Sequence, residues 1–494
     1  MAKFNLSERG VNRTTTYEGA PAFKTPNAKE DLVRKVLTTF FGEPKFYGNV
    51  NEQTKDLVSA IRNMCRKDPA FVRNLAIYAR NTLNLRSVTH AIMAEMAAVN
   101  ESKPFVREVM KEVVVRPDDM TETLAYFLNN YGKPVPNSLK KGLADVFPKF
   151  DEYQLQKYNR DQAVKLKDIL CIAHPRPSTM EYSDIWKRLL EDNLKTPYTW
   201  ETALSARGNN KETWEELIES GKVGYMALLR NLRNILKADP NNVNKVMQTL
   251  SNRDRVLKSR QLPFRFYAAY REIEQFPSFN TEAALETLEE AIGFSVGNVE
   301  RLSGKTLLSA DGSGSMTWSK PSQRSAITCA EIAGLLMSIA QHSCDSAITS
   351  TFSNTFEPLV LNRQSGVLTN TRKVVREMQG GATNMFLIFK WLLDKNIYTD
   401  RIIVISDDQA HPDFAGGGGY FGRRGNAREY FEQYRAKVNR NVWLHIMDTA
   451  GYGRQQFLGE NINYIAGWSE KALAFIPLVE KGVNTMVSYI ENLR

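Results

Sequence analysis

The stretch LLSADGSGSM, residues 307–316, decides how the C-terminal part of this chain is interpreted. An apolar run ends in Asp311, and Ser313 and Ser315 follow with one glycine before each. Because glycine tolerates tight turns, this spacing can aim one carboxylate and two hydroxyls at a single point. Such oxygen ligands suit a hard cation such as Mg²⁺, which keeps coordination positions for water or a partner's oxygen. The stretch therefore predicts a divalent-cation site at a strand end.

Two later segments complete the expected ligand set. GGATN, residues 380–384, is a glycine-led turn into a helix and carries Thr383. RIIVISDD, residues 401–408, is a β-branched strand that ends in Asp407 and Asp408. Ligands of doubly wound α/β sheets bind outside the carboxyl ends of the strands, so the three segments predict one site. Asp407 is preferred over Asp408 because adjacent side chains of a strand point apart.

These segments resemble the metal-ion-dependent adhesion site of von Willebrand factor A domains, over roughly residues 303–494. The matching residues, in the order of the three motifs, are Asp311, Ser313 and Ser315, then Thr383, then Asp407. The resemblance implies one bound divalent cation, Mg²⁺, and a coordination position for an acidic partner. Other chemistries fit poorly, because the chain lacks a phosphate-binding G-x-x-x-x-G-K-[ST] loop and Ser313 lacks the leading glycine of a nucleophile elbow.

The composition is that of a globular protein with more than one domain. The chain has 494 residues, of which 42% are hydrophobic and 24% charged, and its net charge is +10. The excess of basic residues is six in residues 1–300 and four in 301–494, so composition alone does not locate a basic face. We expect a cytoplasmic protein with no membrane association. Its four cysteines are scattered, it has no apolar run of about 18 residues, and its N-terminus has no apolar signal core.

Periodicity divides the chain into three parts. Residues 1–27 read as an extended arm. Residues 28–300 carry successive short helical patterns, in pairs of about 35 to 45 residues that are typical of an α-solenoid of HEAT type. An irregular helical bundle is the alternative there. In residues 301–494, strands alternate with helices, which predicts a parallel sheet in an α/β domain.

The C-terminal pattern is specific enough to place elements. The predicted strands are Lys305–Asp311, Ser346–Ser353, Arg401–Asp407 and Asn441–Asp448, and the predicted helices are Gln323–His342, Asn384–Lys395 and Asn426–Val438. The glycine-rich segment 408–425, which contains Arg423 and Arg424, follows the metal-site strand directly. We expect it to overhang the metal as a mobile basic loop.

Two segments of the helical part combine basic and aromatic residues. The first contains Arg230 and Arg233 in an acid-free window from Gly221 to Ala238. The second, residues 253–271, adds six basic residues and several aromatics. Its candidate RNA ligands are Lys258, Arg260 and Arg265. Basic side chains neutralise phosphates and exposed aromatics stack bases, so the combination suits single-stranded nucleic acid. Core packing of the aromatics, with the Arg and Lys residues exposed, is the other interpretation.

A further segment, KLKDILCIAHPRP at residues 165–177, is an amphipathic helix that ends before Pro175. Lys167, His174 and Arg176 lie on it or directly after it. Without other information this is a helix with an ordinary end, and His174 is as good a capping residue as a ligand.

The order of these motifs is similar to that of the Ro autoantigen family, the TROVE-domain RNA-binding proteins. The motifs are the helix of residues 165–177, ALLRNLR at 227–233, LPFRFYAAY at 262–270 and the D-x-S-x-S stretch. The resemblance covers nearly the whole chain and implies a ring of HEAT-like helices closed by a von Willebrand factor A domain. It also implies binding of small noncoding Y RNA on the outer surface, through Lys167, His174 and Arg176, and of single-stranded ends of misfolded RNA in the ring. Cys171 departs from the basic residue that we expect there.

We therefore expect an RNA-binding scaffold without catalytic activity of its own, a monomer that binds Mg²⁺. The expected partners are small noncoding RNA and misfolded RNA, and an exoribonuclease or another protein at the metal site. A protein-interaction module in which the positive charge is incidental is the main alternative. A metal-dependent nuclease fits less well, because two carboxylates do not make a two-metal site.

Overall fold

We describe the protein from a computed structural model. The described residues are 13–15, 21–24, 27–38, 50–159, 161–195, 198–320, 327–378, 380–407, 427–449, 454–457, 459–466, 471–480 and 486–493. The predicted loop 408–425 and the predicted helix start at Gln323 lie outside them. Two compact units divide the chain, and each is described by itself. The first comprises chiefly Asn27–Pro44, Gly48–Thr202 and Val487–Arg494, and the second chiefly Met1–Pro26 and Ala203–Met486.

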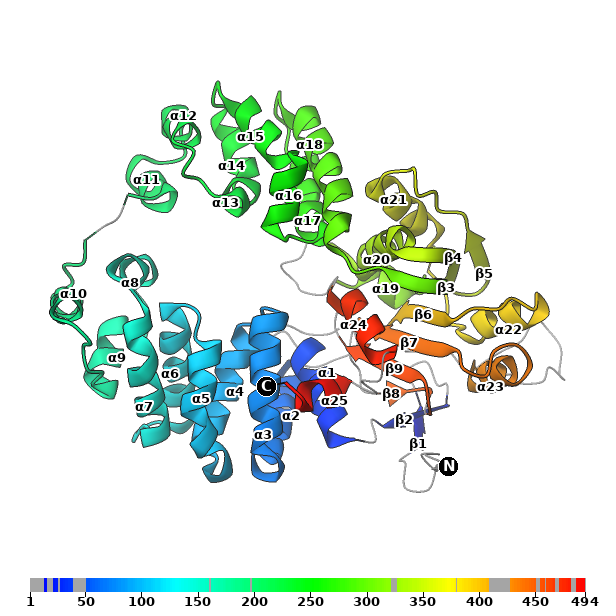
Figure 1. The fold of residues 1–494 in the computed structure, drawn as a ribbon, viewed down its shortest axis with the longest axis horizontal. Coiled ribbons are helices and arrows are strands. Elements are labelled where there is room, and N and C mark those ends of the chain that lie inside the picture. The colour runs from blue at the N-terminus through cyan, green and yellow to red at the C-terminus, as the bar shows by residue number, and fades with distance from the viewer. Residues whose placement is uncertain are drawn as a thin grey trace. The chain divides into compact units, whose positions relative to one another are not determined.

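The first unit is helical (Figure 1). Its helices are α1 (Ala28–Thr38), α2 (Val50–Lys67), α3 (Pro69–Ile77), α4 (Ser87–Ala98), α5 (Val106–Val113), α6 (Pro117–Tyr131), α7 (Asn137–Val146), α8 (Glu152–Tyr158), α9 (Leu166–Ala173), α10 (Met180–Leu190) and α25 (Met486–Glu491). Local chemistry fixes their starts. At α3, for example, Pro69 occupies the first turn and the carboxylate of Asp68 accepts a hydrogen bond from the Phe71 backbone amide at 3.0 Å.

Helices of the first unit alternate between two layers. α2 packs on α4 and α4 on α6, while α3 packs on α5 and α5 on α7. α5 contributes the fully buried Val109 and Met110 of its apolar face to the core of this unit. This alternation is that of stacked helical pairs, so the predicted solenoid of HEAT-like repeats is confirmed over the irregular bundle.

The last helix of the chain, α25, belongs to this unit and packs beside α3. The Asn74 side-chain amide donates to the carbonyl of Ile490 at 2.9 Å, and the Lys29 ammonium pairs with Glu491 at 2.6 Å. Ile490 is fully buried. The sequence prediction assigned these residues to the A domain, because nothing local indicates that α25 packs on helices more than 400 residues away.

The second unit contains helices and a six-stranded sheet. The helical part has a layered arrangement too, with α13 packing on α15, α14 on α17 and α16 on α18. Its helices are α12 (Lys211–Glu219), α13 (Tyr225–Arg230), α14 (Leu232–Ala238), α15 (Val243–Leu250), α16 (Arg253–Ser259), α17 (Pro263–Glu274) and α18 (Thr281–Ser295), and α11 (Trp200–Arg207) spans the boundary between the units.

The sheet has the strand order β5-β4-β3-β6-β7-β9. All neighbours are parallel except β4 and β5, which are antiparallel, so the predicted parallel sheet carries one unpredicted antiparallel edge strand. The strands are β3 (Leu302–Asp311), β4 (Cys344–Phe352), β5 (Phe356–Leu359), β6 (Arg401–Ser406), β7 (Trp443–Asp448) and β9 (Ile462–Ala466).

Helices cover both faces of this sheet. Leu307, Ile402 and Val404 face a core completed by α22 (Phe386–Asp394) and α23 (Ala427–Lys437). The alternate residues of the strands are also fully buried, and α20 (Cys329–Ser343) packs against β3 and β4. The remaining helices are α19 (Gly314–Trp318), α21 (Val367–Glu377) and α24 (Lys471–Glu480). The short α19 was not predicted. α20 begins at Cys329, six residues after the predicted start at Gln323, and the described residues 327 and 328 are not helical.

Part of the predicted N-terminal arm pairs with this unit. β1 (Arg13–Thr15) and β2 (Pro21–Lys24) are antiparallel, and β2 pairs with β8 (Arg454–Gln455). The arm thus supplies two strands of a small sheet. No helix in the described part of the chain has the length and apolar character that crossing a membrane requires.

A buried ionic cluster fixes α24 to the sheet. The Arg401 guanidinium donates to both carboxylate oxygens of Glu480, each at 2.7 Å, and the His445 ring contacts Glu480 at 3.0 Å. Burial opposes ionisation of Glu480, but the hydrogen bonds from Arg401 and His445 outweigh it and lower the pKa of Glu480 to about 2. Arg401 is only 5% exposed, so its charge depends on this partner.

We expect Glu480→Gln to lower the free energy of unfolding by roughly 3 kcal/mol, because it leaves the buried Arg401 charge without its carboxylate. The folded pKa lies below that of an unfolded glutamate, about 4.3, so this stabilisation is present above that pH and is lost as the pH falls toward 2. Urea unfolding followed by circular dichroism at several pH values measures both. Glu460→Gln, at an exposed site, is the control, and equal stability of the two variants would contradict the prediction.

Candidate functional site

The D-x-S-x-S turn lies at the carboxyl end of β3, in the middle of the sheet. Asp311 is fully buried and is the last residue of the strand. The Ser313 backbone amide donates to Asp311 Oδ1 at 2.8 Å, and the Ser406 hydroxyl donates to Asp311 Oδ2 at 2.5 Å. The hydroxyls of Ser313 and Ser315 are 3.1 Å apart. The turn therefore holds the three predicted oxygen donors together, with the carboxylate fixed at both oxygens.

The second predicted segment docks on this turn through its backbone. The Gly380 amide donates to the Gly312 carbonyl at 3.0 Å, and the Gly314 amide donates to the Gly381 carbonyl at 3.3 Å. Gly380 and Gly381 have φ values of +84° and +109°, which side chains other than glycine adopt only with strain. These contacts bring the Thr383 hydroxyl within hydrogen-bonding reach of Asp311, and Thr383 is 1% exposed.

The third predicted ligand, Asp407, directly follows β6, which pairs with β3 in parallel register. Asp407 is 3% exposed. The register therefore places Asp407 at the same sheet edge as Asp311, as predicted. Asp408 lies outside the described residues, so its exclusion as a ligand stays a prediction.

The five residues fit one hard divalent cation. They supply two carboxylates and three hydroxyls, all oxygen donors. Burial raises the pKa of Asp311 above its ordinary value, against hydrogen bonds from Ser406, Ser313 and Thr383, so ionising this carboxyl is costly without a nearby positive charge. A cation would offset that cost. No group of three or more His, Cys, Asp or Glu residues that could hold a metal ion occurs among the described residues.

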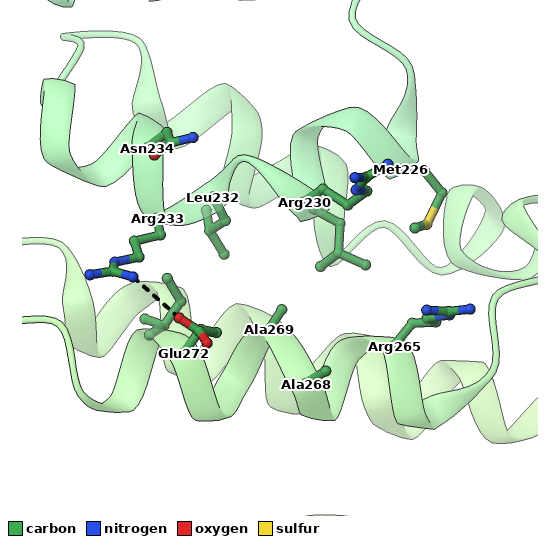
Figure 2. A pocket seen from close by; sticks show the side chains of 11 residues that line it. Met226, Arg230, Leu232, Arg233, Asn234, Arg265, Ala268, Ala269 and Glu272 are labelled. Carbon is green, nitrogen blue, oxygen red and sulfur yellow. Dashed lines mark hydrogen bonds and ion pairs between the residues drawn. The ribbon is translucent and has the colours of Figure 1, made fainter. Parts of the chain in front are cut away.

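Three predicted basic residues of the second unit line a pocket between α13, α14 and α17 (Figure 2). Its volume is about 410 Å³, within the range of small-ligand sites. Three of the five predicted RNA ligands of this region, Arg230, Arg233 and Arg265, line it. The other two, Lys258 and Arg260, are exposed on or next to α16 and do not line it.

The three pocket arginines differ in how they are held. Arg233 pairs with Glu272 at 3.4 Å and its guanidinium lies 5.6 Å from the centre of the Phe276 ring. The guanidinium groups of Arg230 and Arg265 form no ion pair with any described residue, and both residues are exposed. Two positive charges at this pocket are therefore available to an anionic ligand.

The aromatic residues of the same segment are not available for stacking. Phe266, Tyr267 and Tyr270 are at most 6% exposed, and Phe264 is half-buried. The Tyr267 hydroxyl contacts Glu331 of α20 at 3.0 Å, and the ring of Tyr270 lies 5.4 Å from the Arg372 guanidinium. The core interpretation is confirmed for Phe266, Tyr267 and Tyr270, and the alternative of stacking on these three rings is not supported. Tyr267 and Tyr270 contact the α/β domain, and Phe266 packs on Tyr225 of α13.

The third group of predicted ligands lies in the first unit, on α9 and the loop after it. Lys167 is half-buried and pairs with Asp192 at 2.6 Å. His174 is exposed and ends α9 in the left-handed conformation, with φ 49°. Arg176 and Cys171 are exposed. A local ion pair thus partly compensates the Lys167 charge, and Arg176 carries the more available one.

Comparisons with known proteins agree with this architecture. A family profile described as "TROVE domain" matches residues 42–193 and 177–301, and one described as "Ro60 vWA domain" matches residues 305–446. The TROVE match alone spans more than half of the chain. The chain belongs to the TROVE family. Its α/β domain is a von Willebrand factor A domain of the kind found in Ro proteins.

Individual relatives extend the comparison. The crystal structure of the Deinococcus radiodurans Ro (RSR) protein superposes with a TM-score of 0.66 at 18% identity, over 91% of this chain and 99% of that one, and it shows a common fold. "Telomerase protein component 1" of Rattus norvegicus is 27% identical and that of Mus musculus 28%, each over 46% of this chain. This TROVE-family chain spans only 12% of the length of each of these relatives.

Sequence reasoning missed the pocket itself. On α17, the residues Arg265, Ala268, Ala269 and Glu272 have the spacing i, i+3, i+4, i+7 of one helix face. Two alanines at the centre of that face leave room beside the arginine. The spacing is readable in the sequence, but the opposing wall from α13 and α14 is not.

Proposed function

We propose that this TROVE-family protein binds RNA as a scaffold without catalytic activity of its own, with separate sites for single-stranded and structured RNA and one divalent cation in the A domain. The observation that carries the proposal is the pair of exposed arginines at the pocket, Arg230 and Arg265, which form no ion pair with a described residue. RNA phosphates are the common polyanionic ligand for such charges, and each neutralised phosphate releases counterions.

Single-stranded RNA, including the free end of a misfolded RNA, is the proposed ligand of the second unit. Lys258 and Arg260 are exposed and, like Arg230 and Arg265, form no ion pair with a described residue. Many exposed basic residues elsewhere are paired with carboxylates, as Arg107 is with Asp145. Exposed basic residues without a carboxylate partner among the described residues also occur elsewhere, for example Lys133 and Lys187, but Arg230 and Arg265 line one pocket.

A variant with Arg230, Lys258, Arg260 and Arg265 all replaced by Gln should bind single-stranded RNA more weakly. The slope of log K against log salt should become shallower by about 0.7 for each phosphate that the protein no longer neutralises. Fluorescence anisotropy with a labelled oligoribonucleotide at several salt concentrations measures both quantities.

The matched control removes four positive charges that are already in ion pairs. Arg107, Lys245, Arg301 and Lys390 pair with Asp145, Glu219, Asp345 and Asp394. Their replacement by Gln lowers the net charge equally but should leave the slope nearly unchanged. If both variants behave alike, net charge and not this surface attracts RNA. If wild type shows no salt-dependent RNA binding, the alternative of a protein-interaction module is favoured.

A small structured RNA of the Y type is the proposed ligand of α9 and its loop. Support comes from the resemblance of this segment to the family motif and from the exposure of His174 and Arg176. Because Asp192 already pairs with Lys167, the two basic residues Lys167 and Arg176 should contribute unequally.

We expect Arg176→Gln to weaken binding of a structured small RNA more than Lys167→Gln does, and neither to affect binding of a single-stranded oligonucleotide. Competition between the two RNA types, each labelled in turn, measures this. Arg107→Gln, at an ion-paired site in the same unit, is the control. Equal weakening for both RNA types would indicate one shared site.

The A domain is proposed to bind one divalent cation through Asp311, Ser313, Ser315, Thr383 and Asp407. Because all five donors are oxygen atoms, Mg²⁺ is the proposed ion. Two carboxylates balance the charge of the cation without surplus, so a partner's carboxylate, from an exoribonuclease or another protein, would be favoured at an open coordination position.

Asp311→Asn should abolish binding of Mg²⁺ and Mn²⁺ in calorimetry and should remove the rise in melting temperature that these ions cause in wild type. Ser313→Ala, which deletes one hydroxyl donor, should weaken binding less. Asp345→Asn at the start of β4, remote from the carboxyl ends of the strands, is the control. RNA affinity should be the same in all three variants. Wild type without a metal-dependent signal would overturn the assignment.

A further inference from the structure

The pocket beside α17 combines positive charge with apolar side chains. Its lining includes the apolar side chains of Leu229, Leu232, Ala268, Ala269 and Ile273. Figure 2 shows Arg230 and Arg265 together at one end and the Arg233–Glu272 pair at the other, with Ala268 and Ala269 between them. A flat apolar ligand with an anionic group on one side matches this division.

The two ends of the pocket differ in charge. Arg230 and Arg265 are exposed and form no ion pair with a described residue, so their end carries uncompensated positive charge. At the other end, Glu272 compensates Arg233, and Asn234 adds a side-chain amide. That end presents donors and acceptors without net charge, as the edge of a nucleobase requires.

The pocket exists because α17 presents small residues there. Ala268 and Ala269 face α13 and α14 between Arg265 and Glu272, and both are half-exposed. A larger apolar side chain at either position would fill the space without disturbing the helix, since leucine is nearly as good a helix former as alanine. Of the buried rings of α17, Tyr267 and Tyr270 lie against α20 and Arg372, and Phe266 packs on Tyr225 of α13.

We propose that this pocket binds one unpaired nucleotide of the RNA, with its base on the apolar side chains and its phosphate on Arg230 and Arg265. This rests on the proposed binding of single-stranded RNA and adds the base as a recognised group. Arginine guanidinium planes stack on unpaired bases in RNA-binding sites, and apolar side chains pack against bases flipped out of a helix. Here such groups take the place of the three aromatic residues of α17 that are buried in the core. A duplex cannot use the site, because its bases are stacked and paired.

The test separates the base from the phosphates. Full-length protein is titrated with a short oligouridylate and with an abasic ribose-phosphate oligomer of the same length, which has the same charge. Wild type should bind the base-bearing oligomer about tenfold more tightly, near the low end of the range measured for a base on an aromatic side chain, because the pocket has aliphatic and arginine side chains instead. Ala268→Leu and Ala269→Leu should each reduce this preference to nearly one, while the salt slope stays as in wild type.

Ala283→Leu, at an exposed alanine of α18, is the control and should keep the preference. Melting curves of all variants verify that they fold. A 4-thiouridine oligomer should also crosslink to peptides of α13, α14 or α17 in wild type, which locates the base without any substitution.

Three results would overturn the inference. The first is equal affinity of wild type for the two oligomers. The second is an unchanged preference for the base-bearing oligomer in both leucine variants. The third is that an oligoglutamate peptide displaces the oligomer from wild type but does not bind the leucine variants. The last would identify an acidic peptide as the occupant. An unaltered salt slope in the variant lacking Arg230 and Arg265 would instead refute the proposed function.

Discussion

The parallel pairing of β3 with β4 and β6 is the constraint on which the A-domain site depends. Ala310 pairs with Ile405 and Asp311 with Phe352, so the three strands end together at one edge. Among the described residues, polar side chains directly follow these strands, as Ser353 follows β4 and Asp407 follows β6. Because parallel strands point their carboxyl ends to the same side, residues almost 100 positions apart, such as Asp311 and Ser406, meet within hydrogen-bonding distance. A slip of one residue in this register would turn every side chain of the strand to the other face.

In the second unit, α17 has two functions on two of its sides. One side of α17 is tied to the A domain by Tyr267, Tyr270 and Arg271, which contact Glu331 and Arg372. The other side carries Arg265, Ala268 and Ala269 toward the pocket. Three aromatic side chains of α17 are buried by packing, and its alanines and Arg265 remain accessible at the pocket. This division explains why a segment rich in both types need not stack bases on its aromatic rings.

Charge pairing, more than charge content, distinguishes the individual basic residues within both predicted RNA sites. Lys167 and Arg233 each have a carboxylate partner, at 2.6 Å and 3.4 Å, whereas Arg230 and Arg265 have none among the described residues. An existing partner must be given up or shared before a phosphate can bind, so an exposed and unpaired arginine contributes more to affinity. The even spread of net charge along the sequence therefore does not reveal the unpaired positive charges at the pocket.

The sequence alone determined the elements whose signals are local. The β-branched run of β6, the D-x-S-x-S turn after β3 and the glycine-led turn before Thr383 were all readable, because the direction of parallel strands leaves few arrangements. That their residues bind a metal stays a prediction. The short helices of the first half were equally readable from their period. Tertiary structure decided the rest. It placed α25 among the N-terminal helices, buried the aromatic rings of α17, paired Lys167 with Asp192, and set α13 and α14 opposite two alanines to form a pocket. These features depend on contacts between residues that are distant in the chain or on separate helices, and no local propensity or spacing encodes which surfaces will meet.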